Sequence, residues 1–364
     1  MRGWLATFAV LALGCTASAP LPEASLPGAA SEPAPAPRKP PPDFVFPPTG
    51  PVTLRPGAPP PEGTLYQILV EYEGRTETVD DSSEAAQRDP DTVDEKTALE
   101  IDYRDLPVHS PDSNRIASSL VLEALQRRTR IQPPGTEHLI EIGDDRLRVS
   151  KNDKVDTDLR GAQPKQDLTP RTVLGKPFAL IVDDANGNPE SVQLRGLPAA
   201  KKLLATLPLR EPIAYLQMGY PEHPVSPGDT WHAKRFLPNP IGKLGLSVDL
   251  ELRLLDFERN GAAPCAHVVV RGKADATNLP SEIGFVFDEA HYEVSGDVWF
   301  DLVTGEVAEA RIQDIAASSY HRVATSMPAR LRMRYEGHAS LRRLDALPSS
   351  ERWADGTKRF SAVK

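Results

Sequence analysis

The sequence predicts a mainly β protein in which one large antiparallel sheet curls into a barrel, a half-barrel or a sandwich, with one to three short helices. Three observations lead to this prediction. Long segments alternate between apolar and polar residues, turn-forming residues separate consecutive alternating segments, and helical periodicity is scarce. Alternation with a period of two is typical of half-buried strands. Because the pattern indicates ten or more strands, we expect the sheet to be too wide to stay flat.

Alternation begins at Leu65, where the first half of the predicted sheet starts. Two alternating segments each carry one apolar face: Tyr66, Ile68, Val70 and Tyr72 in the first, and Leu99, Ile101 and Tyr103 in the second. Two hairpins follow, one over residues 140–149 with a turn at Gly143-Asp144-Asp145, and one over 178–194 with a turn at Asn186-Gly187-Asn188. Asn-Gly supplies the positive φ angles that tight turns require.

The clearest strand of the second half covers residues 244–254, where every second residue is apolar and most of the others are polar. A hairpin that turns at Thr304-Gly305 comes next. A late strand carries Leu331, Met333 and Tyr335 on one face and Arg330, Arg332 and Arg334 on the other. These segments extend the same antiparallel pattern.

Helical signals are few. Pro198 and the apolar spacing that follows it predict a short amphipathic helix that ends before Pro208, because proline is favoured in the first turn and disfavoured further on. Residues 116–125 fit a helix and a strand equally well, and the sequence does not separate the two.

Composition excludes several classes of function. The net charge is −9, whereas general nucleic-acid binding needs a basic face, so we expect no nucleic-acid partner. The only long apolar run lies at the N-terminus, and we expect no other segment to span a bilayer. The chain without its N-terminal region is long enough for one large β domain or two coupled subdomains.

The N-terminal residues predict an export signal that ends in a lipid anchor. Arg2 precedes an apolar run over residues 4–13, which is too short to cross a membrane but suits a signal peptide. Ala12-Leu13-Gly14-Cys15 resembles the lipobox of bacterial lipoproteins, in which the cysteine is diacylated and becomes the first residue. The competing cleavage motif, Ala17-Ser18-Ala19, is followed by Pro20, a poor residue after a cut. We therefore expect Cys15 to hold the protein on a lipid bilayer.

By resemblance to the sorting rule of Gram-negative lipoproteins, Thr16 after the cysteine implies the outer membrane, on its periplasmic or surface face, if the source is Gram-negative. The predicted location is therefore the cell envelope, with the protein anchored by lipid.

A proline-rich tether is expected to separate the anchor from the folded part. Sixteen of the 37 prolines lie between residues 20 and 61, and such a segment favours extended polyproline II over sheet or helix. We expect a signal peptide over 1–14, Cys15 with a disordered tether to residue 62, a β-rich domain over 63–345 that could divide near residue 210, and a tail over 346–364. Phe44-Val45-Phe46 is an apolar island that could dock on the domain.

Three motifs together resemble a family of bacterial surface lipoproteins of unknown function. They are Leu174-Gly175-Lys176-Pro177-Phe178, the Asn-Gly hairpin that follows, and Pro224-Val225-Ser226-Pro227-Gly228-Asp229-Thr230-Trp231. The resemblance covers roughly residues 65–345 and implies a β-rich domain, with no assigned reaction or catalytic residue. From the residues themselves, we interpret Gly228 and Asp229 as a structural turn and Trp231 as a core side chain.

Searches for enzyme motifs find no metalloprotease, nucleophile-elbow, Walker or dinucleotide-binding pattern. The sequence therefore predicts no catalytic residue and no cofactor. Glu289, His291 and Glu293 alternate along one predicted strand face and are a candidate metal site, with a solvated polar face as the alternative. Cys265 is interpreted as a free buried thiol, and a Cys265–His267 metal or redox pair as the less favoured alternative.

Two candidate binding surfaces complete the analysis. Arg330, Arg332 and Arg334 form a stripe that could meet anionic groups, although pairing with acidic neighbours explains it equally well. The apolar face of the curled sheet could enclose a hydrophobic ligand or be a filled core.

We therefore expect a non-enzymatic envelope lipoprotein that binds a hydrophobic ligand or an envelope protein. The alternatives are a structural envelope component or a metal-dependent envelope hydrolase. An open cavity would favour ligand binding, an exposed apolar patch a protein partner, and neither feature a structural role.

Overall fold

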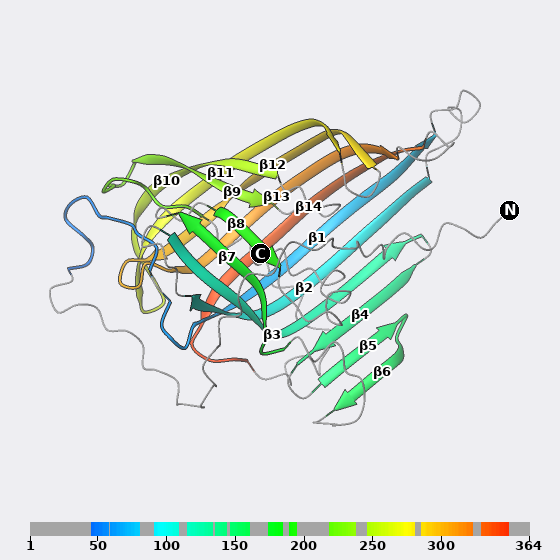
Figure 1. Cartoon of the computed structure of the whole chain (residues 1–364), viewed down its shortest axis with the longest axis horizontal. Coiled ribbons are helices and arrows are strands. Elements are labelled where there is room, and N and C mark those ends of the chain that lie inside the picture. Colours follow the sequence, from blue (N-terminus) through cyan, green and yellow to red (C-terminus); the bar gives the residue numbers. More distant parts are fainter. Residues whose placement is uncertain are drawn as a thin grey trace.

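The computed structural model describes residues 45–57, 59–80, 91–108, 115–133, 135–143, 146–160, 174–184, 189–194, 218–237, 246–280, 285–322 and 329–348. Fourteen strands in these ranges form one antiparallel sheet, which Figure 1 shows as a strongly twisted and curved surface. No helix occurs within these ranges. The mainly β fold with a large antiparallel sheet is therefore confirmed. Within the same ranges, no helix has the length and apolar character needed to cross a membrane.

The strands of the first half are β1 (Thr64–Asp80), β2 (Asp91–Val108), β3 (Arg115–Gln132), β4 (Thr136–Ile142), β5 (Arg146–Lys151), β6 (Lys154–Arg160), β7 (Pro177–Asp184) and β8 (Pro189–Leu194). Those of the second half are β9 (Thr230–Leu237), β10 (Leu246–Asn260), β11 (Ala263–Pro280), β12 (Phe285–Asp301), β13 (Val307–Arg322) and β14 (Ala329–Leu344). Several of these strands exceed 15 residues, well above the usual length.

The strand order is β6-β5-β4-β3-β2-β1-β14-β13-β12-β11-β10-β9. The sheet is open, because the described parts of its two end strands, β6 and β9, pair with different neighbours and not with each other. Strands that precede and follow residue 210 lie in the same sheet, joined by the pairing of β1 with β14. The second half is a plain antiparallel meander in which each strand pairs with the next.

β3 is the point at which the sheet forks. Residues 115–121 of this strand pair with β7, whereas residues 125–131 pair with β4. β7 and β8 therefore form a branch apart from β4–β6, as Figure 1 shows. The segment 116–125, which fitted both a helix and a strand, is part of β3. Consecutive residues there are buried on both faces, so the segment lacks the alternation of a one-sided strand.

One face of the main sheet is continuously apolar. Ile68 lies opposite both Ile101 and Leu341 in the register, and the same face continues across the sheet. This apolar face is defined by its fully or nearly fully buried residues Ile68, Leu99, Ile101, Leu125, Leu341, Ile312, Val298, Val268, Val270, Leu250, Leu252 and Leu254. The opposite face, called the polar face, carries Glu251, Arg253, His267, Trp299 and Arg311.

The predicted hairpins are confirmed by the pairs β4–β5, β7–β8 and β12–β13. The strand predicted over 244–254 is β10 in the described part. Turn residues 144–145 and 186–187, the helix predicted from Pro198, Cys15 with the signal peptide, and residues 349–364 lie outside the described residues.

The last part of the expected tether packs on the sheet. Leu54 is buried, and Val52 exchanges two backbone hydrogen bonds with Val225, at 2.9 and 2.8 Å. Gly57 donates a backbone hydrogen bond to the carbonyl of Gly305 at 3.1 Å. The Arg259 guanidinium lies 5.0 Å from the centroid of the Phe46 ring. Residues 45–57 and 59–62 therefore belong to the packed structure and not to a free tether.

Candidate functional site

The turn before β9 is held by its own hydrogen bonds. The backbone N–H of Ser226 donates to the Asp229 carboxylate at 2.8 Å, and the N–H of Asp229 donates to the Ser226 carbonyl at 3.0 Å. Gly228 has φ 99°, a region that favours glycine. Gly228 and Asp229 also bond with the backbone of Leu254, which ties the turn to β10. The structural role predicted for Gly228 and Asp229 therefore has a clear geometric basis.

This turn fixes Trp231 at the edge of the apolar face. Trp231 lies opposite Leu252 of β10, and only 8% of its surface is exposed. The side chain belongs to the apolar core, as the sequence predicted. It also does something that the sequence did not indicate, because it forms one wall of a pocket.

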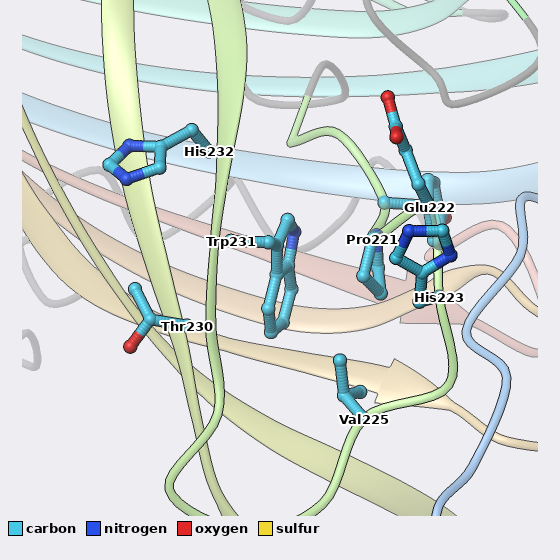
Figure 2. A pocket seen from close by; sticks show the side chains of 8 residues that line it. Pro221, Glu222, His223, Val225, Thr230, Trp231 and His232 are labelled. Carbon is cyan, nitrogen blue, oxygen red and sulfur yellow. The ribbon is translucent and has the colours of Figure 1, made fainter.

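The pocket has a volume of about 340 Å³ and lies between the start of β9 and the preceding segment. Its lining consists of Tyr220, Pro221, Glu222, His223, Val225, Thr230, Trp231 and His232. Figure 2 shows that Trp231, Pro221, His223 and Val225 gather on one side of β9, whereas the side chains of Thr230 and His232 leave the strand on the other side.

The pocket combines an apolar floor with a polar rim. Pro221, Val225 and Trp231 are buried, whereas Glu222 and His223 are exposed. The volume is at the lower end of the range of small-molecule sites, which are mostly apolar with a few polar groups. This arrangement suits a small ligand that has a flat apolar body and a polar end.

The indole N–H of Trp231 is the most informative polar group in the pocket. The nitrogen is buried and has no hydrogen-bond partner within the described part of the chain. A buried donor without an acceptor costs roughly 1–3 kcal/mol. In Figure 2 the nitrogen lies on the side of the ring that faces Pro221 and Glu222. A ligand oxygen in the pocket would satisfy this donor.

Tyr220 fixes the opposite wall. Its hydroxyl donates to the Gly305 carbonyl at 2.8 Å, and its ring packs on Phe300 with centroids 5.1 Å apart. Residues 220–223 were absent from the sequence-based candidates, because prolines without periodicity gave no signal for a binding wall.

The predicted metal residues Glu289, His291 and Glu293 lie on β12. His291 Nδ1 is 2.6 Å from Asp275 Oδ1, and its Nε2 is 3.2 Å from Glu293 Oε1. The hydrogen bond from Asp275, then the Glu293 carboxylate, raises the pKa of His291. Within the described ranges, Glu289, His291 and Glu293 do not form a group with all ligand atoms within 4.8 Å of one another. The structure therefore does not support a metal centre of these three residues.

The predicted arginine stripe lies on β14. Arg330 Nε is 3.3 Å from the Asp288 carboxylate, which also contacts His321 at 2.8 Å. Arg332 and Arg334 are exposed and lie opposite Glu77 and Arg75 of β1. One arginine of the stripe is thus paired with an acidic neighbour, as the alternative explanation predicted, and the anion-binding role stays a prediction for the other two.

Cys265 is buried and free, as expected. Burial, then the nearby Asp301 carboxylate, raises the pKa of its thiol to about 12. Such a thiol is a poor nucleophile and a poor metal ligand. The less favoured pair of Cys265 with His267 therefore has no support in the thiol.

Comparison with known proteins adds no identity. No protein-family model matches the chain, and no curated protein has a matching sequence. Among solved structures, the crystal structure of Acinetobacter baumannii OccAB4 is 6% identical, with a TM-score of 0.17, and the match covers 78% of this chain and 100% of that one. A crystal structure of a receptor binding domain is 6% identical, with a TM-score of 0.11, and covers 77% of this chain and 82% of that one. Scores this low do not establish a shared fold.

Proposed function

We propose that this protein is a lipid-anchored, non-enzymatic component of the bacterial cell envelope that binds a small amphipathic ligand in the pocket beside Trp231. The lipobox-like segment that ends at Cys15 supports the anchor. The observation that carries the binding role is the buried indole N–H of Trp231, which lies in a pocket of about 340 Å³ and has no acceptor within the described residues.

The ligand version is favoured over a protein partner by the distribution of exposed apolar side chains. The large ones among the described residues are Val45, Val93, Val155, Leu255 and Leu347. They come from five separate segments of the chain, whereas a protein interface is expected to gather such residues in one patch. The pocket likewise favours binding over a purely structural role, for which we expected neither a cavity nor a pocket.

Benzophenone is a suitable probe, because it has two flat apolar rings and one carbonyl acceptor for the indole N–H. Under ultraviolet light it inserts into nearby C–H bonds. The full-length lipidated protein, purified in detergent, would be irradiated with benzophenone, digested and mapped by mass spectrometry. We expect the adducts to concentrate on residues 218–237.

Trp299 provides a matched control, since it is equally buried, at 8% exposure, but lies outside the pocket lining. Trp231→Ala should reduce the adducts severalfold, and Trp299→Ala should leave their yield and position unchanged. Circular dichroism would confirm that both variants fold. Adducts spread evenly over the sheet, or an equal effect of the two substitutions, would contradict the proposal.

A further inference from the structure

A second cluster of polar side chains lies on the polar face, around His267 of β11. Asp256 and Glu258 reach it from β10, and Asp297 and Trp299 reach it from β12. His267 is only 17% exposed at its side chain, so the imidazole is well enclosed by these neighbours. None of these residues lines the Trp231 pocket.

A bulge in β10 creates the cluster. The register between β10 and β11 shifts between Leu254 and Asp256, so Asp256 lies opposite His267. A bulge adds one residue to a strand and redirects the side chains beyond it. Two carboxylates from β10 can therefore converge on one imidazole of the next strand.

Both carboxylates face the same nitrogen. Glu258 Oε1 lies 3.2 Å from His267 Nδ1, and Asp256 Oδ1 lies 3.7 Å from the same atom. Ligand atoms of Asp256, Glu258 and His267 all lie within 4.8 Å of one another. In a tetrahedral zinc site with bonds of about 2.1 Å, neighbouring ligand atoms are roughly 3.4 Å apart. The two measured distances fall on either side of that value.

The other neighbours hold these groups in place. His267 Nε2 is 2.8 Å from Asp297 Oδ1, and the Trp299 ring stacks on the imidazole with centroids 4.7 Å apart. The indole N–H of Trp299 donates to Glu258 Oε1. A carboxylate on the second nitrogen of a histidine is the usual support of a metal ligand, since it fixes the tautomer and the ring orientation.

With the ring proton on Nε2, directed at Asp297, the lone pair of Nδ1 faces two carboxylates. That arrangement needs a cation between the three groups. His291 is different, because Asp275 approaches one of its nitrogens and Glu293 the other. One carboxylate for each nitrogen satisfies an imidazolium but leaves no common point for an ion.

We propose that Asp256, Glu258 and His267 bind one divalent transition-metal ion. The mixture of one nitrogen and two oxygen ligands suits Zn²⁺, whereas Mg²⁺ and Ca²⁺ prefer oxygen alone. Three protein ligands leave a fourth position for water or another ligand. Asp297 and Trp299 act as positioning residues, which orient His267 and Glu258 without touching the ion.

Isothermal titration of the full-length protein with zinc chloride tests the proposal. The protein carries no polyhistidine tag, and excess magnesium chloride suppresses weak binding to other acidic groups. We expect one saturable site, with affinity reduced at least about tenfold in His267→Ala and in Asp256→Asn. Asp256→Asn is the safer variant for folding, because 62% of the Asp256 side chain is exposed. Cobalt(II) should give the visible absorption of a tetrahedral site in the wild type and lose it in both variants.

His291→Ala is the matched control and should leave zinc affinity and the cobalt spectrum unchanged. The proposal is overturned if the wild type shows no saturable zinc binding, because a proton alone would then balance the carboxylates. It is equally overturned if His267→Ala and Asp256→Asn both bind like the wild type, or if His291→Ala weakens binding as much as they do.

Discussion

Trp231 and Trp299 are equally buried, at 8% exposure each, but they lie on opposite faces of the same sheet. Trp231 is on the apolar face with Leu252, and Trp299 is on the polar face beside His267. Their indole N–H groups differ as well. That of Trp299 donates to Glu258, whereas that of Trp231 has no acceptor within the described residues.

Phenylalanine substitutions should separate the two tryptophans in stability. Both changes remove the same atoms from equally buried positions, but only Trp299→Phe breaks a hydrogen bond. We expect Trp299→Phe to lower the free energy of unfolding by about 1 kcal/mol more than Trp231→Phe, near the lower bound for a bond to a charged acceptor because Glu258 is partly exposed. Urea unfolding of both variants measures the difference, and equal losses would contradict the assignment of the two N–H groups.

Asp105 should make stability depend on pH. Its Oδ1 is buried without a hydrogen-bond partner in the described part of the chain. Burial raises the pKa of its carboxyl to about 7, although a hydrogen bond from Ser118 opposes the shift. Between the ordinary pKa of 3.8 and this value, the folded state keeps a proton that the unfolded state releases.

The contribution of Asp105 to stability is therefore full below pH 3.8 and falls as the pH rises to 7, by at most about 4 kcal/mol. Asp105→Asn has no carboxyl to ionise and should lose this dependence. The quantity to measure is the difference in unfolding free energy between wild type and variant at pH 5 and pH 8. A difference that does not change with pH would show that Asp105 titrates normally.

His291 should titrate above its ordinary pKa, chiefly because of its hydrogen bond with Asp275. A raised folded-state pKa contributes stability below the ordinary value of 6.5, and this stability is lost as the pH rises through the folded-state pKa. Asp275→Asn should lower the pKa of His291 toward 6.5, as followed by NMR of the ring protons. Glu293→Gln, at the more distant carboxylate, should lower the pKa less. If Glu293→Gln had the larger effect, the assigned cause would be wrong.

The two cysteines provide a test of the lipid anchor. Because the Cys265 thiol is buried and its pKa is raised to about 12, the native protein should not react with Ellman's reagent at neutral pH. After unfolding in guanidinium chloride, the mature protein should show one reactive thiol, since lipidated Cys15 is a thioether. Two reactive thiols would mean that Cys15 is unmodified. The Cys265→Ala variant, which should show none, is the control.

Gly296 should resist substitution. A Cβ atom added there would lie 2.1 Å from the carbonyl oxygen of Arg311 and 2.9 Å from Cα of Ile312, both in the backbone of β13. Gly296→Ala is expected to cost about 2–3 kcal/mol of unfolding free energy through strand displacement. Gly50→Ala is the control, because an added Cβ meets nothing within 4 Å. Similar unfolding curves for the two variants would show that β12 and β13 have room to separate.

Alternation predicted most of the fold because the main sheet buries one face. Tyr66, Ile68, Leu99 and Ile101 fall on the apolar face as expected, and β10 follows the predicted pattern. The segment 116–125 could not be assigned for the opposite reason, since β3 is buried on both faces there. Neither the fork at β3 nor the pairing of β1 with β14 could be predicted, because local patterning does not specify partners far apart in the sequence.

The candidate sites were harder to predict. Trp231 was identified only as a core side chain, because a pocket depends on the gap between segments and not on residue type. His267 was noted beside Cys265, but its carboxylate partners come from the neighbouring strand beyond a bulge. His291 and Glu293 do meet, although Asp275 of the next strand is the closer partner.

The pairing of β1 with β14 also constrains how the protein is made. The ribosome produces β1 early, but its partner on that side is complete only after β14 emerges. Until then, one edge of β1 carries unpaired backbone groups that can recruit other strands. Contacts so distant in sequence also slow folding. We therefore expect the nascent protein to be a strong client of holding chaperones, and fragments that end before β14 to aggregate and not to form half of the sheet.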